Sequence, residues 1–251
     1  MKICRISHLS QEYWGILLEG NIHRLIGDLY DSPGVGEKIC SLDEAVFLPP
    51  LQNINKVPAI AANYGEKDER DGPGIFMKQP GTYLEHGGQI IYPRACKTVI
   101  HEAELGIVIG KKARHVEEVN ALQYVLGYTC VNDVSGREMK ESDQGKGLSM
   151  RWKHFDTFCP MGPFIETNVE SPMDLDIECF VNGELSVSGN TSGMIFSVPK
   201  LISWVSEVMT LYPGDIIPTG CPGVAEINVG DVIEVKIESI GSLVNSVIAD
   251  Y

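Results

Sequence analysis

Three acidic side chains lie where polar sequence meets apolar sequence. Glu102 and Glu104 precede the apolar run 105–109, and Asp133 follows a second apolar run, 128–131. If the first run and the glutamates form one strand, the two glutamates point to the same face, roughly 6 to 7 Å apart along the backbone. Two carboxylates on one face repel each other unless a positive charge lies between them.

Carboxylate oxygens that converge at strand ends form a site of hard ligands. Mg²⁺ and Mn²⁺ prefer such ligands and keep open positions for water and substrate. The alternative is two solvated glutamates on a sheet surface and an aspartate in a turn. Spacing alone favours this alternative, so the surrounding residues must decide between a metal site and an ordinary surface.

The elements that carry these side chains are expected to be strands. Short β-like runs broken by turn residues fill residues 1–55, with Glu19-Gly20-Asn21 as a hairpin turn. From about residue 89 the apolar runs again have strand length. This balance predicts a mainly β protein of the α+β class, with a small N-terminal β-rich subdomain at 1–55 and a catalytic domain at 56–251.

Other segments of the chain carry distinct local signals. Apolar spacing predicts helices at 116–126 and 198–211. Asn182-Gly183 predicts a tight hairpin turn, and residues 232–248 predict a closing hairpin through Gly241. The stretch 65–88 is rich in glycine, proline and charge, which is typical of a lid or an active-site loop.

Composition restricts the class of protein. The 251 residues suit one large domain, or one domain with a small appendage. A formal net charge of −14 argues against binding to nucleic acid. No apolar run reaches about 18 residues, so no membrane span is expected. Seven cysteines without a C-x-x-C pair read as free thiols, and the N-terminus lacks a secretory signal, so we expect a cytoplasmic protein.

Seven motifs around the carboxylates then appear in a fixed order. They are Asn63-Tyr64, Phe76-Met77-Lys78, Glu102-Ala-Glu104-Leu-Gly-Ile-Val-Ile-Gly110, Asn132-Asp133-Val-Ser-Gly-Arg137, Lys153-His-Phe-Asp156-Thr-Phe-Cys-Pro160, Gly189-Asn-Thr-Ser-Gly-Met-Ile-Phe196 and Thr219-Gly-Cys-Pro222. From about residue 57 to the C-terminus the chain resembles the fumarylacetoacetate hydrolase family. The resemblance implies a mixed β-sandwich roll with short helices, a homodimer, and one Mg²⁺ or Mn²⁺ held by Glu102, Glu104 and Asp133.

The resemblance also implies the chemistry. Relatives hydrolyse acylpyruvates, decarboxylate oxaloacetate, or isomerise and decarboxylate ring-cleavage dioic acids, as in the catabolism of aromatic compounds. A 2-oxo acid can chelate a metal through a carboxylate oxygen and its 2-oxo oxygen. The Lewis acid then stabilises the enolate that forms when a neighbouring bond breaks.

Further residues receive roles from the matching motifs. Lys153 is expected to balance charge or to bind the substrate carboxylate, and the Thr219 hydroxyl is expected to meet the substrate. The second threonine of the family's T-G-T-P loop is Cys221 here, for which we expect a packing role because no cysteine–histidine pair is indicated. Arg137 is expected to hold a carboxylate through its planar fork.

Three more residues complete the expected substrate site. Tyr64 and Lys78 are expected to frame the mouth of the pocket. Lys140 stands where the family often has glutamine, seven residues after Asp133.

The pattern breaks where relatives that hydrolyse their substrate activate water. Their N-Y-x-x-H-x-x-E motif has a histidine and a glutamate at the positions that Lys67 and Arg70 occupy here. Lysine is a poor base near neutral pH unless burial or a nearby cation lowers its pKa. We still count Lys67 among the candidate catalytic residues, beside Lys153 and Thr219.

Several other residues remain possible bases. His86 lies in the lid-like stretch, His101 points away from Glu102 if the strand alternates, and His154 adjoins Lys153. Glu66 or Glu69 would serve if the lid is shifted by a residue or two.

The sequence therefore predicts a Mg²⁺- or Mn²⁺-dependent enzyme that holds a small oxo-acid as its enolate. C–C bond hydrolysis, decarboxylation and keto–enol isomerisation all fit. The lost histidine and glutamate lower the expectation of hydrolysis and raise that of the other two. The alternative is a catalytically weak or inactive relative that binds a metabolite.

Overall fold

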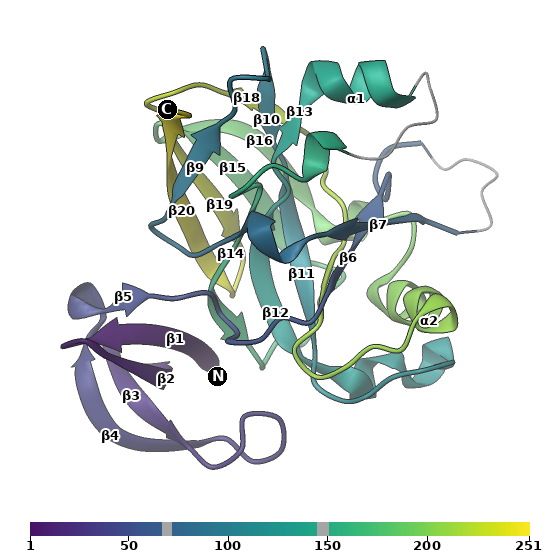
Figure 1. The fold of residues 1–251 in the computed structure, drawn as a ribbon. Coiled ribbons are helices and arrows are strands. Elements are labelled where there is room, and N and C mark those ends of the chain that lie inside the picture. Colours follow the sequence, from purple (N-terminus) through teal and green to yellow (C-terminus); the bar gives the residue numbers. More distant parts are fainter. Residues whose placement is uncertain (67–71, 145–150) are drawn as a thin grey trace.

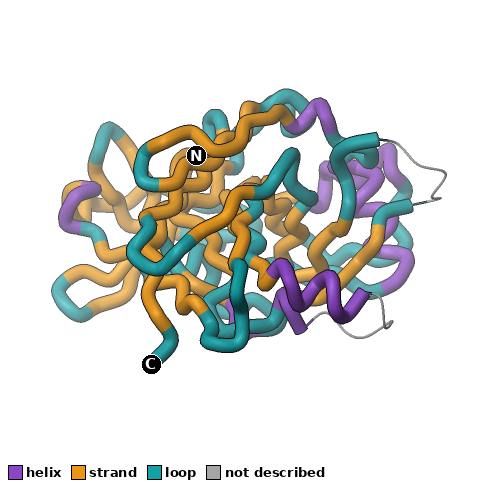
Figure 2. The backbone as a smooth tube through the Cα atoms, turned by 90° about the horizontal axis from the view of Figure 1, so that it is seen from above, coloured by secondary structure: helices purple, strands orange, loops and turns teal. Residues whose placement is uncertain are grey.

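Strands are the main secondary structure of the chain. The computed structural model describes residues 1–66, 72–144 and 151–251, and in this part most elements are strands (Figure 1). The predicted mainly β fold with short helices is confirmed. Figure 2 shows the same chain from above, with most of the helical segments toward one end of the molecule.

The main sheet begins with strands of the predicted catalytic domain, 56–251, and continues into the N-terminal strands. Its order is β17 (Ile216–Pro218), β11 (Ala103–Ile109), β12 (Val125–Asn132), β14 (Cys159–Glu166), β1 (Lys2–His8), β2 (Gln11–Leu18), β3 (Asn21–Ile26) and β4 (Gly34–Ser41), while β5 (Val46–Phe47) pairs with β1 and β8 (Tyr83–Leu84) pairs with β14. Antiparallel pairing of β1 with β14 joins the two portions, through Lys2 opposite Glu166 and Ile3 opposite Ile165.

Three smaller sheets make up the rest of the β structure in residues 1–66, 72–144 and 151–251. One has the order β16 (Glu184–Asn190), β15 (Asp176–Val181), β19 (Val232–Ile237), β20 (Gly241–Ala249) and β9 (Gln89–Tyr92). The second has the order β13 (Ser135–Gly136), β10 (Val99–His101) and β18 (Ala225–Ile227), and the third pairs β6 (Val57–Ala61) with β7 (Gly74–Lys78).

The helical elements are short. The α-helices in the described part of the chain are α1 (Arg137–Gln144) and α2 (Val198–Val208). The 3₁₀ helices of the described residues are η1 (Leu42–Glu44), η2 (Pro80–Thr82), η3 (Glu118–Tyr124), η4 (Arg151–Lys153) and η5 (Thr191–Gly193). In the part of the chain that the structure describes, no helix is long and apolar enough to cross a membrane.

The largest hydrophobic cluster lies between the main sheet, the five-stranded sheet and α2. Leu105 and Ile107 of β11 share it with Ile177 of β15, Val235 of β19 and Leu201 of α2, all at most 1% exposed. Close packing against two sheets and a helix fixes the position of β11. This rigidity matters because the predicted metal ligands lie at the start of β11 and at the end of its neighbour β12.

The predicted hairpins are confirmed. Asn182 and Gly183 both have positive φ, 53° and 80°, between the paired strands β15 and β16. Two positive φ values favour the type I′ turn, whose twist matches that of the strands. Gly20 supplies a φ of 75° in the turn between β2 and β3, and the closing hairpin forms from β19 and β20 with Gly241 as the first residue of β20.

The helix predictions need correction. Residues 118–124 form a 3₁₀ helix, and residues 125–127 belong to β12. A 3₁₀ helix has three residues per turn, so the expected α-helical face does not form, and Val119 is 85% exposed. The second helix begins as predicted, with Ser197 as its N-cap, but ends at Val208.

The stretch 65–88, expected as a lid or an active-site loop, contains two strands in the part that the structure describes from residue 72 onward. Residues 74–78 form β7, which pairs with β6 along its whole length. Residues 83–84 form β8, which pairs with β14. Residues 67–71 lie outside the described part.

Candidate metal and substrate site

The carboxylates predicted from the sequence lie in one cavity of about 250 Å³. The described residues that line it are Ile60, Ala61, Ala62, Asn63, Tyr64, Phe76, Glu102, Glu104, Asp133, Lys140, Trp152, Lys153, Gly220, Cys221 and Val224. They come from the ends of β6, β11 and β12, from β7, from α1 and η4, and from the loop after β17.

Backbone contacts between neighbouring strands bring the three carboxylates together. Glu102 does not lie in the same strand as Glu104, because it forms the break between β10 and β11. The backbone N–H of Asp133 donates to the carbonyl of Glu102 at 2.9 Å. The backbone N–H of Glu102 donates to Oδ1 of Asn132 at 3.2 Å. These bonds hold the end of β12 against the break, so both strands present their acids to the cavity.

Two buried lysines hold Asp133. Nζ of Lys78 donates to Oδ1 of Asp133 at 2.7 Å and to the carbonyl of Phe158 at 2.6 Å. Nζ of Lys153 donates to the other carboxylate oxygen, Oδ2, and lies 3.1 Å from Oε1 of Glu102. Burial alone would raise the pKa of Asp133, but the two ammonium groups outweigh it and hold this pKa below its usual value.

Glu104 has the opposite electrostatic environment. It is 1% exposed, and its Oε2 accepts a hydrogen bond from the backbone N–H of Gly220 at 2.8 Å. Burial, and then the negative charges of Asp133 and Glu102, raise the pKa of Glu104 well above its ordinary value. A carboxyl group buried beside two others is a position where a bound cation would relieve repulsion.

The loop after β17 closes the cavity on one side. Gly220 has a φ of +89°, and a Cβ there would lie 3.0 Å from Cβ of Asn63, so glycine suits both the backbone and the space. Nδ2 of Asn63 donates to the carbonyl of Thr219 at 2.9 Å, while its Oδ1 accepts from the N–H of Phe196 at 2.8 Å. Asn63 therefore ties two distant segments to the cavity, a role that the sequence did not reveal.

The donor set fits a divalent cation. One carboxylate oxygen of Glu102, one of Glu104 and Sγ of Cys221 all lie within 4.8 Å of one another. Asp133 faces the same cavity, although both of its oxygens contact ammonium groups. Convergent carboxylates in a small cavity are the ligands that Mg²⁺ and Mn²⁺ prefer.

The other predicted site residues are only partly brought together. Tyr64 and Lys140 line the cavity with Lys153. Lys78, expected at the pocket mouth, has a fully buried side chain behind Asp133, because its ammonium group completes this ion pair. Lys67 lies outside the described residues.

Arg137 and Thr219, like Lys78, are not among the residues that line the cavity. Arg137 begins α1, and its guanidinium pairs with Glu226 on the surface. Thr219 is 0% exposed, and its Oγ1 has no hydrogen-bond partner among the described residues. Its carbonyl accepts from Nδ2 of Asn63 next to Gly220, so the backbone of Thr219 helps to shape the site, and the role of its hydroxyl toward the substrate stays a prediction.

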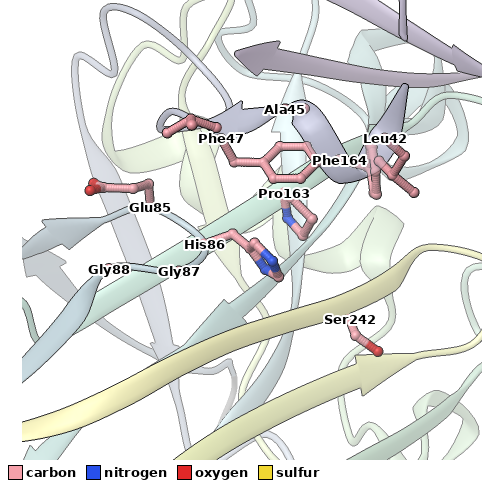
Figure 3. A pocket seen from close by; sticks show the side chains of 11 residues that line it. Leu42, Ala45, Phe47, Glu85, His86, Gly87, Gly88, Pro163, Phe164 and Ser242 are labelled. Carbon is pink, nitrogen blue, oxygen red and sulfur yellow. The ribbon is translucent and has the colours of Figure 1, made fainter. Parts of the chain in front are cut away.

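None of the three histidines considered as bases lines this cavity in the described part of the chain. Burial lowers the pKa of His101 to about 4, and this side chain is 0% exposed. His154 contacts the carbonyl of Met77 through Nε2 at 2.7 Å. His86 lies in a larger hollow of about 660 Å³, where Figure 3 shows it near Phe47 and Phe164.

The sequence also gave no indication of Trp152. Its side chain lines the cavity at 3% exposure, and its indole N–H has no acceptor among the described residues. Trp152 directly precedes Lys153, but nothing in its spacing distinguishes a cavity wall from an ordinary core position.

Comparison with known proteins decides the family. A sequence model of the fumarylacetoacetate (FAA) hydrolase C-terminal domain matches residues 51–248, and one for the Rv2993c-like N-terminal region matches residues 1–50. The chain belongs to the fumarylacetoacetate hydrolase family.

Relatives in this family carry several enzymatic names. The uncharacterized protein MJ1656 of Methanocaldococcus jannaschii is 48% identical over 70% of this chain and 73% of its own. Human mitochondrial oxaloacetate tautomerase FAHD2A is 37% identical over 82% of this chain and 70% of its own. The 4-hydroxyphenylacetate degradation bifunctional isomerase/decarboxylase of Salmonella dublin is 38% identical over 81% of this chain and 49% of its own.

Solved structures of family members share the whole fold. The 2-hydroxyhepta-2,4-diene-1,7-dioate isomerase of Mycobacterium marinum matches with a TM-score of 0.91 and 35% identity, over 100% of this chain and 99% of that one. Maleylpyruvate hydrolase from Sphingobium sp. SYK-6, in complex with manganese(II) and pyruvate, matches with a TM-score of 0.84 and 26% identity over all of both chains. This chain is thus an enzyme of a family whose members include hydrolases, isomerases and decarboxylases.

Proposed function

We propose that this enzyme binds Mg²⁺ or Mn²⁺ through Glu102, Glu104 and Asp133 and acts on a small oxo-acid. The observation that carries the proposal is the meeting of these three carboxylates with Lys153 in one cavity. The manganese and pyruvate in the maleylpyruvate hydrolase relative support the same assignment. When bound, the cation would supply a Lewis acid that stabilises negative charge on the substrate next to the bond that changes.

The charges of the cavity suit an anionic substrate. Three carboxylates and the two ammonium groups of Lys78 and Lys153 leave one net negative charge. A divalent cation converts it to one net positive charge, so the loaded cavity attracts a carboxylate despite the acidic surface of the chain. Lys140, which also lines the cavity, adds a further positive group.

Lys153 is suited to electrostatic binding rather than to proton abstraction. Burial acts to lower its pKa, but Asp133 and Glu102 outweigh burial and raise this pKa above its ordinary value. The ammonium group therefore stays charged and has little capacity to accept a proton. Because Asp133 and Glu102 fix its position, it can face a substrate carboxylate without reorganisation.

Tyr64 is suited to donate a hydrogen bond. Burial, and then the charge of Glu104, raise the pKa of its hydroxyl group. The hydroxyl stays protonated at neutral pH, and it has no hydrogen-bond partner among the described residues. A substrate oxygen beside Tyr64 would provide the missing acceptor.

The reaction we propose is keto–enol isomerisation or decarboxylation rather than hydrolysis. Lys67 and Arg70 replace the residues that activate water in relatives that hydrolyse their substrate, and no histidine lines the described cavity. The names of the human and Salmonella relatives, a tautomerase and an isomerase/decarboxylase, support this choice.

We further propose a homodimer in the cytoplasm, where the seven free thiols would stay reduced.

A substrate panel tests the reaction class. Oxaloacetate, acylpyruvates and 5-oxo-dienedioates are assayed separately with Mg²⁺ and Mn²⁺, in wild type and in Lys67→Ala. We expect tautomerisation or decarboxylation and slow acylpyruvate hydrolysis. Acylpyruvate hydrolysis at ordinary enzymatic rates, unchanged in Lys67→Ala, would contradict the proposed class.

A further inference from the structure

Cys221 differs from the other cysteines in its exposure and its neighbours. The other six are buried, while Cys221 is partly exposed and lines the cavity. Its Sγ lies 3.5 Å from Oε2 of Glu102 and within 4.8 Å of an oxygen of Glu104. The packing role expected from the sequence does not account for a thiol that faces two carboxylates.

The backbone fixes this thiol in place. Cys221 directly follows Gly220, whose N–H donates to Glu104 at 2.8 Å. Thr219, which precedes Gly220, is also held in place. Its carbonyl accepts from Asn63, and its N–H donates to the carbonyl of Leu105 at 3.0 Å. The sulfur is therefore presented on the same anchored loop that holds Glu104.

Sulfur changes the preference of a metal site. Carboxylates suit Mg²⁺ and Mn²⁺ alike, whereas thiolate is a soft ligand that favours transition ions. In the family's T-G-T-P loop this position holds a threonine, which offers a hydroxyl instead.

We propose that Cys221 is a direct metal ligand that makes the site select a first-row transition ion over Mg²⁺. The inference rests on the proposed metal site and specifies which ion it takes. On binding, the thiol loses its proton to solvent and the thiolate sulfur bonds to the cation; nothing is oxidised or reduced. Without a cation, the S–H group donates to Glu102.

Absorption spectroscopy with Co²⁺ tests the sulfur ligand directly. Co²⁺ is titrated into wild type, Cys221→Ser and Cys221→Thr, under a non-thiol reductant. Cys40→Ser, which changes a buried cysteine in β4, is the matched control. We expect a near-ultraviolet sulfur-to-cobalt charge-transfer band in wild type and the control, and none in the Cys221 variants. Circular dichroism verifies that each variant is folded.

Calorimetry then measures selectivity. A site of this kind binds Co²⁺ and Mg²⁺ with different affinities whether or not sulfur is a ligand, so the informative quantity is the change on substitution. Loss of an outer-shell partner alone typically weakens metal binding about 10- to 100-fold, so loss of a direct sulfur ligand in Cys221→Thr should weaken Co²⁺ binding by about tenfold or more, and Mg²⁺ binding much less. If wild type binds Co²⁺ without the sulfur band, the inference is overturned and the carboxylate site stands. If no ion binds to wild type, both the inference and the proposed function fail.

Discussion

The Nζ atom of Lys78 lies 2.7 Å from Oδ1 of Asp133, and the two side chains are 0% and 2% exposed. Lys153 contacts the other oxygen of the same carboxylate. Asp133, which was expected only as a metal ligand, is thus also the centre of a buried ion-pair network. The two ammonium groups lower the pKa of Asp133 and so keep its carboxylate ionised before any ligand binds.

Removing one member of this network should destabilise the protein strongly. Lys78→Met leaves Asp133 buried with one fewer ammonium partner, and loss of a buried partner typically costs about 3–5 kcal/mol. Lys236→Met is the control, because Lys236 pairs with Glu178 at 2.8 Å but is 51% exposed. Because water and salt screen this exposed pair, its loss should change stability far less than Lys78→Met does. Urea unfolding at pH 7 with a chelator measures the change in the free energy of unfolding for both variants. Equal changes in Lys78→Met and Lys236→Met would refute the buried network.

Glu104→Gln should act in the opposite direction in the metal-free protein. Burial and two neighbouring carboxylates disfavour the charge of Glu104, while a glutamine oxygen can still accept from the N–H of Gly220. We expect a gain of about 0.5–2 kcal/mol in the free energy of unfolding without metal. The same variant should lose the increase in melting temperature that Mn²⁺ gives wild type. Glu178→Gln, on the surface, is the control: it should leave the metal-free stability unchanged and keep the Mn²⁺-induced increase in melting temperature. A Glu104→Gln variant that is less stable than wild type without metal would contradict the account.

Whether a feature could be predicted from the sequence depends on how far apart in the chain its contacting residues lie. Hairpin turns and the N-cap at Ser197 depend on neighbouring residues, so they were predicted correctly. The E-x-E motif and Asp133 were brought together because they flank paired strands.

Contacts between distant residues were not predictable in this way. The contact of Lys78 with Asp133 spans 55 residues, and that of Arg137 with Glu226 spans 89. Neither leaves a local pattern, so Lys78 was expected at the pocket mouth and Arg137 on the substrate. For the same reason, the cavity-lining role of Trp152 had no signal in the sequence.

The pH dependence of stability should report on His86. Burial lowers its pKa below the ordinary value of 6.5, and its Nδ1 accepts from the N–H of Val244 at 3.1 Å. As pH falls, the unfolded chain therefore binds the proton first, and this side chain's contribution to stability declines below about pH 6.5. Relative to His86→Gln, wild type should lose stability between pH 7 and pH 5. Thermal unfolding of both proteins from pH 7 to pH 5 measures this loss. A difference in stability between wild type and His86→Gln that stays constant over this range would contradict the burial of a neutral His86 ring.

The proposed homodimer is tested by static light scattering coupled to size exclusion. One chain has a mass of 27.6 kDa, and we expect twice this mass across the usable concentration range. A stable homodimer in this size class buries at least about 1,000 Å² of surface, so dilution should not separate it readily. A monomer mass at every concentration would defeat the proposal.

The most direct test of the central claim is calorimetric titration of Mn²⁺ into wild type and Asp133→Asn. Asparagine keeps the size of the side chain but removes its charge, and circular dichroism verifies that the variant is folded. The account predicts saturable binding of one ion per chain in wild type and no measurable binding in the variant at millimolar concentrations. Absence of binding to wild type, or equal binding to the variant, would show that Glu102, Glu104 and Asp133 do not form the metal site.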